Sequence, residues 1–264
     1  MTPKFSTNNI GAILRFPFED PDATRKLLIA GLIALAGFII PLLPWIVLAG
    51  YTAEIVRRVV RDGASELPEW NDWGRLLEDG LKVTAAYFIF LLPLIIPVLL
   101  STGSVFFFPA AEEAARAGSD GAAALLMVVG FSMFLVTILI SMVLSILISL
   151  AAPAGLTHLV MKDDFGAAFR VREWWPIFKA NLTGFIWAFL VVLGISMAIG
   201  LLSQILVITI VLICLLPVLY AAMYAYVMPV WGALIGAAYR EGSEELAVTP
   251  QPAEDAAPAG VDEA

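Results

Sequence analysis

The chain has 264 residues, of which 61% are hydrophobic and 14% are charged, and its formal net charge is −8. Soluble domains carry about 25% charged residues, so this composition excludes an ordinary soluble globular protein. Four stretches contain no Asp, Glu, Lys or Arg, and each exceeds the roughly 20 apolar residues that a helix needs to cross a bilayer. The sequence therefore predicts an all-α, polytopic bundle of transmembrane helices. The uncharged stretches are 27–53, 83–111, 121–161 and 182–239.

The first uncharged stretch follows a polar N-terminal segment, 1–16, which lacks the apolar run and cleavage site of a signal peptide, so we expect the stretch to stay in the mature protein. It can cross once as a kinked helix, or twice as a hairpin that turns at 41–44. One crossing leaves five basic residues on the outer face, whereas the hairpin leaves only Arg116 there. Charge therefore favours a hairpin with helices near 24–40 and 45–62, and a re-entrant loop that does not fully cross is the remaining alternative.

A basic segment, 57–82, follows this hairpin. It holds five of the fifteen basic residues, so we expect it on the cytoplasmic face. Glu54 lies three residues before Arg57 on the same predicted helix. This spacing favours a local ion pair over an intramembrane functional carboxylate.

The end of this segment, 70–81, has the pattern of a helix that lies in the headgroup plane. Large apolar residues fall on one helical face, and charged residues cover the other. The sequence therefore predicts a short amphipathic interfacial helix, with Trp70 and Trp73 at the membrane interface. An aromatic ligand clamp is the alternative. The apolar face consists of Trp73, Leu76, Leu77 and Leu81.

The third and fourth spans are predicted near 83–101 and 122–150, and the outer loop between them contains Arg116. On the fourth span a hydroxyl residue recurs every four positions, so these side chains form one slowly drifting stripe. We interpret the stripe as a packing seam, because small residues permit close helix packing; the alternative is the wall of a polar pathway. The stripe consists of Thr137, Ser141, Ser145 and Ser149, and its expected partners are Gly184, Ala188, Ser196, Gly200, Gly232 and Gly236.

A second basic segment, 162–179, is also expected on the cytoplasmic face. Trp174 and Trp175 precede the fifth span there, and indole rings favour the membrane interface. His158 is the only histidine, which excludes metal sites built on several histidines. Cys214 is the only cysteine, which excludes an intramolecular disulfide.

The last uncharged stretch has 58 residues and therefore crosses twice, near 182–202 and 205–239, with a turn at 203–204. The predicted result is a single membrane domain, 1–242, with six spans in the cell membrane and both termini in the cytoplasm. The remaining segment, 243–264, is rich in Pro, Ala and acidic residues, so we predict a disordered tail. A docking peptide is the alternative reading of this tail.

A pattern near the start of the chain recurs 155 residues later. Residues 10–16 and 165–171 both read apolar-Gly-Ala-apolar-apolar-Arg-apolar. Basic residues and a hydrophobic stretch follow each copy, and each stretch ends in Arg, an acidic residue and Gly, at 61–63 and 240–242. We interpret the pattern as a parallel internal repeat of an in-plane helix plus a hairpin; chance similarity among apolar residues is the alternative.

Five segments together carry a family resemblance: 12–18, 49–51, 68–74, 79–82 and 164–170. Through them the chain resembles the uncharacterised multi-pass proteins of the domain-of-unknown-function 4013 family, found in archaea and bacteria. The match covers most of the chain except the acidic tail, and its most specific element is the Trp-Asn-Asp-Trp-Gly sequence. The resemblance implies no activity and no catalytic residues, because the family has none assigned.

The sequence contains no Walker loop, nucleophile elbow or paired-histidine motif, and no ionisable residue at mid-membrane depth. We therefore expect no catalytic residues, cofactor or metal, and no enzymatic activity. Two function classes remain. We favour a structural, accessory or partner-binding membrane protein, and the alternative is a transporter or channel-like protein for a neutral or lipid-like substrate. The expected partners are the lipid bilayer and a membrane protein or a second copy of the chain, with no nucleic acid.

Overall fold

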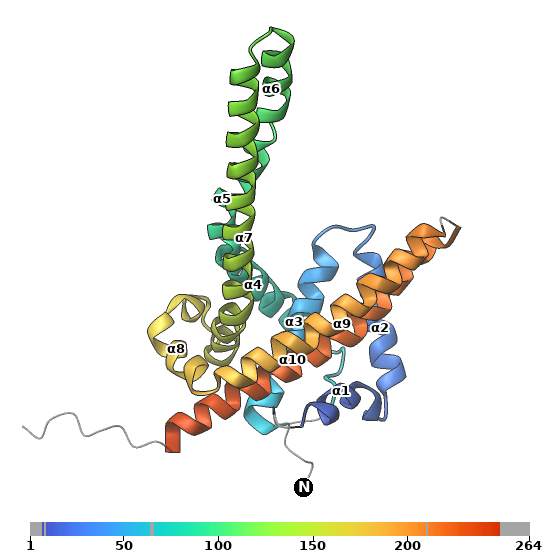
Figure 1. Cartoon of the computed structure of the whole chain (residues 1–264). Helices are drawn as coiled ribbons and strands as arrows, with labels where there is room; N and C mark the ends of the chain where they lie inside the picture. Colours follow the sequence, from blue (N-terminus) through green and yellow to red (C-terminus); the bar gives the residue numbers. More distant parts are fainter. Residues whose placement is uncertain (1–6, 8, 64–65, 210, 249–264) are drawn as a thin grey trace, which may run out of the picture.

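The computed structural model describes residues 7, 9–63, 66–209 and 211–248, and this part of the chain folds into helices without a strand (Figure 1). The predicted all-helical fold is therefore confirmed for the described residues. The α-helices are α1 (Ile10–Glu19), α2 (Ala23–Ala36), α3 (Leu43–Asp62), α4 (Trp73–Leu91), α5 (Ile95–Ser104), α6 (Phe107–Arg116), α7 (Asp120–Lys162), α8 (Val171–Ala180), α9 (Leu182–Ile208) and α10 (Leu216–Val248). The 3-10 helices are η1 (Leu92–Leu94), η2 (Phe165–Phe169) and η3 (Val211–Leu215).

Four helical segments are long and apolar enough to cross a membrane, and they indicate a membrane protein. The N-terminal hairpin is present, but its arms are not among these four. α2 has 14 residues, about 21 Å of helix, against the roughly 30 Å of a bilayer core. Charged residues interrupt the second half of α3. The four segments are Trp73–Arg116, Asp120–Lys162, Leu182–Ile208 and Leu212–Val248.

The helices of the second half extend beyond their predicted spans. α7 continues past the predicted end at Leu150 to Lys162, and α9 runs to Ile208 instead of turning at Ser203. The predicted turn is wrong because the Ser203 hydroxyl donates to the carbonyl of Ile199, so the helix accommodates this polar residue. The chain reverses later, around η3.

The predicted interfacial helix 70–81 is not a separate element. Its helical part forms the first turns of α4, which starts after the N-cap Asp72 and continues without a break into the third span. The break comes at η1, where Pro93 lies in the first turn. Proline lacks the backbone N–H that an α-helix needs, so it ends the regular hydrogen-bond pattern there.

α3 and α4 cross at two glycines. A Cβ on Gly50 would overlap the carbonyl oxygen of Leu76, and a Cβ on Gly80 would overlap that of Ile46. Only glycine permits the two backbones to approach this closely. The crossing buries Leu76, one of the residues that we predicted on the apolar face of an interfacial helix.

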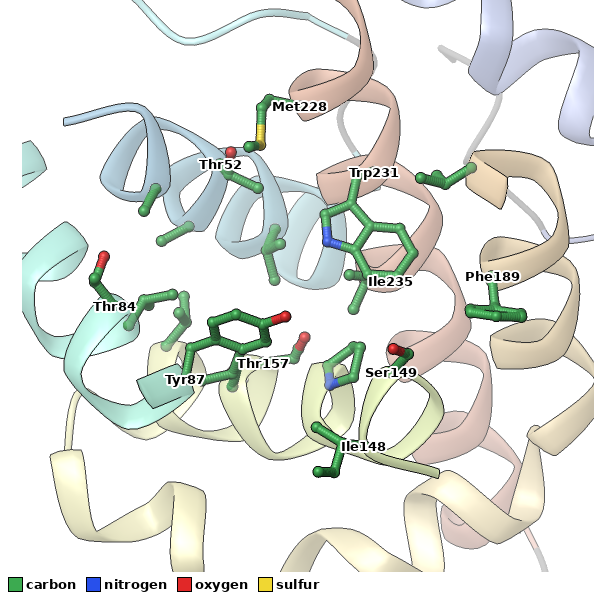
Figure 2. Close-up of a pocket in the computed structure, with 18 of the residues that line it drawn as sticks. Thr52, Thr84, Tyr87, Ile148, Ser149, Thr157, Phe189, Met228, Trp231 and Ile235 are labelled. Carbon is green, nitrogen blue, oxygen red and sulfur yellow. The ribbon is translucent and has the colours of Figure 1, made fainter. Parts of the chain in front are cut away.

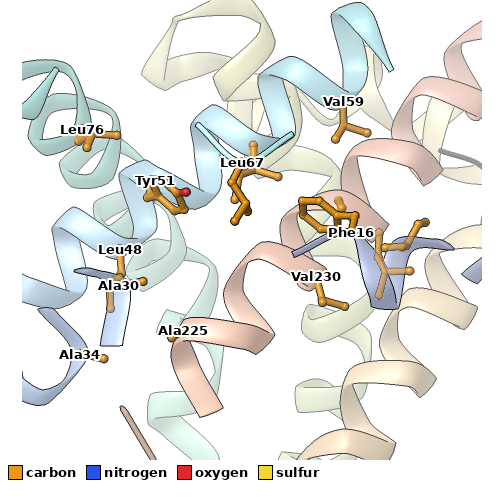
Figure 3. Packing of buried hydrophobic residues seen from close by; sticks show 14 of the residues in the cluster. Phe16, Ala30, Ala34, Leu48, Tyr51, Val59, Leu67, Leu76, Ala225 and Val230 are labelled. Carbon is orange, nitrogen blue, oxygen red and sulfur yellow. The ribbon is translucent and has the colours of Figure 1, made fainter. Parts of the chain in front are cut away.

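One hydrophobic core joins this crossing to the N-terminal helices and to α10 (Figure 3). Phe16 of α1, Ala30 of α2, Leu48 of α3 and Val230 of α10 are buried in the same cluster. We call this packed part of the molecule the base: it consists of α1–α3, the start of α4, α8, the end of α7 and α10 from Ala221 onward.

A loop between α3 and α4 is fixed to the base by two aromatic side chains. The ring of Trp70 stacks on that of Tyr51, with centroids 4.0 Å apart, and its indole N–H donates to the carbonyl of Lys26. The Tyr51 hydroxyl donates to the carbonyl of Pro68. The described part of this loop, 66–72, is therefore packed into the core through Pro68 and Trp70.

A buried ion pair holds the junction of α1 and α2 against the same loop. The Asp20 carboxylate accepts hydrogen bonds from Lys26 Nζ (3.0 Å) and from the backbone N–H groups of Asp22 and Leu67. Burial acts to raise the pKa of this carboxyl, but the hydrogen bonds outweigh burial and hold the pKa below its ordinary value. Asp20 is therefore ionised and fully satisfied inside the protein.

Two groups of helices leave the base in different directions (Figure 1). α7 packs beside α4, α5 and α6, and α9 packs beside α10. The close fit of the first group shows at Gly130 of α7, where an added Cβ would collide with the side chain of Phe107. The two groups diverge away from the base, and both α7 and α9 carry exposed large apolar side chains.

The end of α10 departs from the predicted tail. Residues 243–248 are helical, because Ser243 donates to the carbonyl of Arg240 and Glu244 lies 3.6 Å from Arg240 Nε one turn away. The prediction of disorder is therefore wrong for these six residues. The rest of the tail, 249–264, lies outside the described residues.

The two copies of the predicted repeat differ in local structure. Residues 10–16 lie on the α-helix α1, whereas the second copy forms the 3-10 helix η2, and α8 begins at Val171. Each copy precedes a helical hairpin, α2–α3 or α9–α10. The internal repeat stays a prediction.

Candidate functional site

A cavity of about 560 Å³ lies where the two diverging groups of helices meet the base (Figure 2). Five helices line it: α3, α4, α7, α9 and α10. This volume is in the range of small-molecule sites, which measure about 300–1,000 Å³. This cavity could not be expected from sequence patterns, because its walls come from segments up to about 190 residues apart.

The walls of the cavity are mostly apolar and carry no carboxylate, basic or imidazole side chain. None of its lining residues is Asp, Glu, Lys, Arg or His. Hydroxyl groups and one indole supply the polar atoms on an otherwise aliphatic and aromatic surface. These polar residues are Thr52, Thr84, Tyr87, Ser149, Thr157, Ser196 and Trp231.

One side of the cavity is open to the surroundings of the protein. Four residues that line it are also exposed: Tyr87 and Phe88 of α4, and Leu193 and Ser196 of α9. These residues lie within helical segments that are long and apolar enough to cross a membrane. If these segments cross, the open side of the cavity faces lipid.

The predicted hydroxyl stripe of α7 changes character along the helix. Thr137, Ser141 and Ser145 each donate to a carbonyl of their own helix, three or four residues earlier. Ser149 makes no hydrogen bond to a described residue, and it lines the cavity together with Thr157. Along the stripe, the hydroxyls of the first three residues therefore bond to their own helix, whereas the Ser149 hydroxyl at the cavity wall makes no such bond.

The small residues expected to face the stripe lie against other parts of the molecule. Gly232 and Gly236 of α10 approach Thr52 and Val59 of α3, and space is open around Gly200. The small residues of α10 therefore pack on α3 rather than on α7. Of the other expected partners, Gly184 and Ala188 are buried, and Ser196 lines the cavity.

A buried histidine connects three helices close to the cavity. His158 of α7 lies 2.6 Å from the hydroxyl of Tyr239 on α10, through Nδ1, and 2.9 Å from the carboxylate of Glu173 on α8, through Nε2. The hydrogen bond from His158 lowers the pKa of Glu173, so this carboxylate is ionised and can only accept. Nε2 of His158 is therefore the donor to Glu173, and Nδ1 is the ring atom that bonds to the Tyr239 hydroxyl.

A second buried cluster lies at the crossing of α3 and α4. Arg57 donates to Glu54 at 2.6 Å and to Asp79 at 2.8 Å, so the predicted pair of Glu54 and Arg57 is confirmed. The bond to Asp79 could not be expected from helical spacing, because Asp79 belongs to another helix. The two carboxylates hydrogen-bond the guanidinium of Arg57. None of these three residues lines the cavity.

The four tryptophans predicted at the membrane interface divide into two kinds. Trp70 and Trp174 are buried, and the indole of Trp174 donates to the carbonyl of Ala168. Trp73 and Trp175 are exposed and are free to contact a headgroup layer. The sequence around each tryptophan does not predict which ones are buried. Burial depends on tertiary contacts, of Trp70 with α3 and of Trp174 with η2.

Comparisons with known proteins identify a family but no activity. Residues 33–208 match a family described as a protein of unknown function (DUF4013). No curated protein and no solved structure matches the chain. The role of the cavity must therefore be argued from its own chemistry.

Proposed function

The chain belongs to the DUF4013 family, whose function is unknown, and we propose from the cavity's chemistry that it is a membrane protein that binds a neutral, lipid-like molecule. The observation that carries this proposal is an uncharged cavity of about 560 Å³ with exposed aromatic and aliphatic residues at its open side. An ion would lose its hydration there without gaining a counter-charge. A neutral molecule with long apolar parts matches both the walls and the surroundings.

We propose binding without catalysis. The polar atoms of the cavity are hydroxyls and one indole N–H, and His158, Arg57 and their carboxylate partners are engaged with one another outside it. Binding of this kind suits an accessory protein that presents or retains a lipid, and it is also the first step of transport.

We further propose that the chain crosses the membrane six times, with α2 and α3 as a short hairpin and both termini in the cytoplasm. The charge distribution supports this topology, because it leaves Arg116 as the sole basic residue on the outer face. Two contacts are consistent with it: Lys82 lies 3.0 Å from Asp163, and the backbone N–H of Thr7 donates to Glu241. Reporter fusions at residues 1 and 250 should give the same sidedness, and opposite sides would refute six crossings.

Blocking the cavity tests the binding proposal. Ser196 is exposed and lines the cavity from α9, so Ser196→Phe should fill the space without disturbing the base. Gly200→Phe is the matched control, because this position lies one turn further along α9 and has open space around it. We expect native mass spectrometry of the purified full-length chain to show retained lipid for the natural chain and for Gly200→Phe, and at least a fivefold loss for Ser196→Phe.

Two outcomes would refute the proposal. One is a natural chain that retains no lipid under conditions that keep it folded. The other is equal retention by Ser196→Phe and Gly200→Phe.

A further inference from the structure

The cavity contains polar groups that the protein itself leaves without a partner. The hydroxyls of Tyr87 and Thr157 and the indole N–H of Trp231 line the cavity and make no hydrogen bond to a described residue. Figure 2 shows these three polar ends directed toward the same part of the cavity. They come from α4, α7 and α10, so only the folded chain brings them together.

Thr157 is the most informative of the three. Its side chain is buried, with a relative exposure of 2% for the residue, and a helical threonine can usually donate to the carbonyl four residues earlier. Thr52, Thr137 and Ser203 do so in this chain. The Thr157 oxygen is not sealed inside the protein, because it opens onto the cavity, so this hydroxyl is available to bond to a molecule bound there.

Trp231 determines what that molecule must offer. An indole N–H donates and cannot accept, so the bound group must be a hydrogen-bond acceptor. Phosphate and carboxylate are acceptors, but no Lys or Arg lines the cavity to neutralise them. The remaining acceptors are uncharged oxygens, such as those of an ester, a ketone or an alcohol.

We propose that the cavity holds the uncharged ester end of a neutral glycerolipid, bound by Tyr87, Thr157 and Trp231, with its acyl chains leaving past Phe88 and Leu193 into the bilayer. This inference rests on the proposed function and adds the headgroup class and its orientation. The polar end faces the hydroxyl of Thr157, and the apolar end leaves through the exposed side of the cavity.

Quenching of tryptophan fluorescence by brominated lipids tests this assignment. The full-length chain in phosphatidylcholine nanodiscs is titrated with diacylglycerol, phosphatidic acid or phosphatidylcholine, all three carrying the same dibrominated acyl chains. The difference between the natural chain and Trp231→Phe isolates the signal of Trp231. We expect diacylglycerol to quench this signal at a mole fraction at least tenfold lower than either phospholipid.

Variants that remove one hydroxyl test the polar contacts. Tyr87→Phe and Thr157→Val should each raise the half-quenching mole fraction of diacylglycerol about threefold, which corresponds to one membrane hydrogen bond of average strength. Thr157→Ser keeps the hydroxyl and should restore the natural value. Tyr220→Phe and Thr137→Val are controls, because both positions lie outside the cavity wall.

The outcomes separate this inference from the proposed function. Equal quenching by the three lipids would overturn the assignment of an uncharged headgroup, and so would unchanged binding in both hydroxyl variants. If Ser196→Phe still abolishes lipid retention in either case, binding stands and only the headgroup is wrong. If no brominated lipid quenches Trp231, the orientation in the cavity is wrong.

Discussion

The two parts of α7 are built for different surroundings. Only Gly130 and Thr137 are buried in its first thirty residues, whereas most residues of 152–160 are buried within the base. The first part presents large apolar side chains outward, as a helix does in lipid, and the second part packs small and polar residues against four other helices. A single uncharged run of sequence therefore serves two purposes, and substitutions should be far more costly in the base than along the exposed part.

The largest effect is expected at the crossing of α3 and α4. Gly50→Leu places side-chain atoms where the backbone of Leu76 now lies, so the base should not form. Size-exclusion chromatography in detergent should show no monodisperse protein. Gly194→Leu, on the exposed part of α9 with open space around it, should behave like the natural chain. Equal yields of the two variants would contradict the close crossing.

Removing the buried arginine should be the next most costly change. Arg57→Met leaves Glu54 and Asp79 without their shared cation, and breaking a buried ion pair in this way costs about 3–5 kcal/mol. Unfolding in mixed micelles would measure the loss. Arg116→Met is the control, because the exposed pair of Arg116 with Glu112 contributes less than about 1 kcal/mol.

The ion pair of Asp20 predicts a dependence on pH. Because the folded-state pKa of Asp20 lies below its ordinary value of 3.8, the stabilisation is complete above that value and is lost as the pH falls through the folded-state pKa. Asp20→Asn should lower the free energy of unfolding at pH 7 by about 1.5–3 kcal/mol and flatten its acid dependence. An unchanged acid limb in Asp20→Asn would show that other carboxylates control acid unfolding.

The smallest effects are expected along the hydroxyl stripe, and they sharpen the comparison within α7. Ser145 is exposed, so Ser145→Leu should change the free energy of unfolding by less than about 0.5 kcal/mol. Thr137 is buried, so Thr137→Leu should destabilise by about 1–3 kcal/mol through overpacking. Equal effects at both positions would show that the whole stripe is a seam, as we predicted from the sequence.

Sequence patterns predicted well wherever the evidence is local. The pair of Glu54 and Arg57 was recognisable because both residues lie on one helix, and the long helices were recognisable because an uncharged run of 20 or more residues satisfies its own backbone in lipid. Boundaries were less accurate. Serine is common in turns, yet the hydroxyl of Ser203 bonds to a carbonyl of its own helix. The free-energy difference between a turn and a continued helix at such a residue is too small to be predicted from amino-acid composition.

The sequence by itself determined that this chain is a helical membrane protein of a recognisable family, because hydrophobicity and charge act over neighbouring residues. The tertiary structure decided which residues meet: Trp70 on Tyr51, His158 between Tyr239 and Glu173, and the polar ends of Tyr87 and Trp231 in one cavity. These contacts join residues far apart in the chain. Their formation depends on the close approach of whole helices at small residues, and a one-dimensional pattern of hydrophobicity does not specify which helices approach one another.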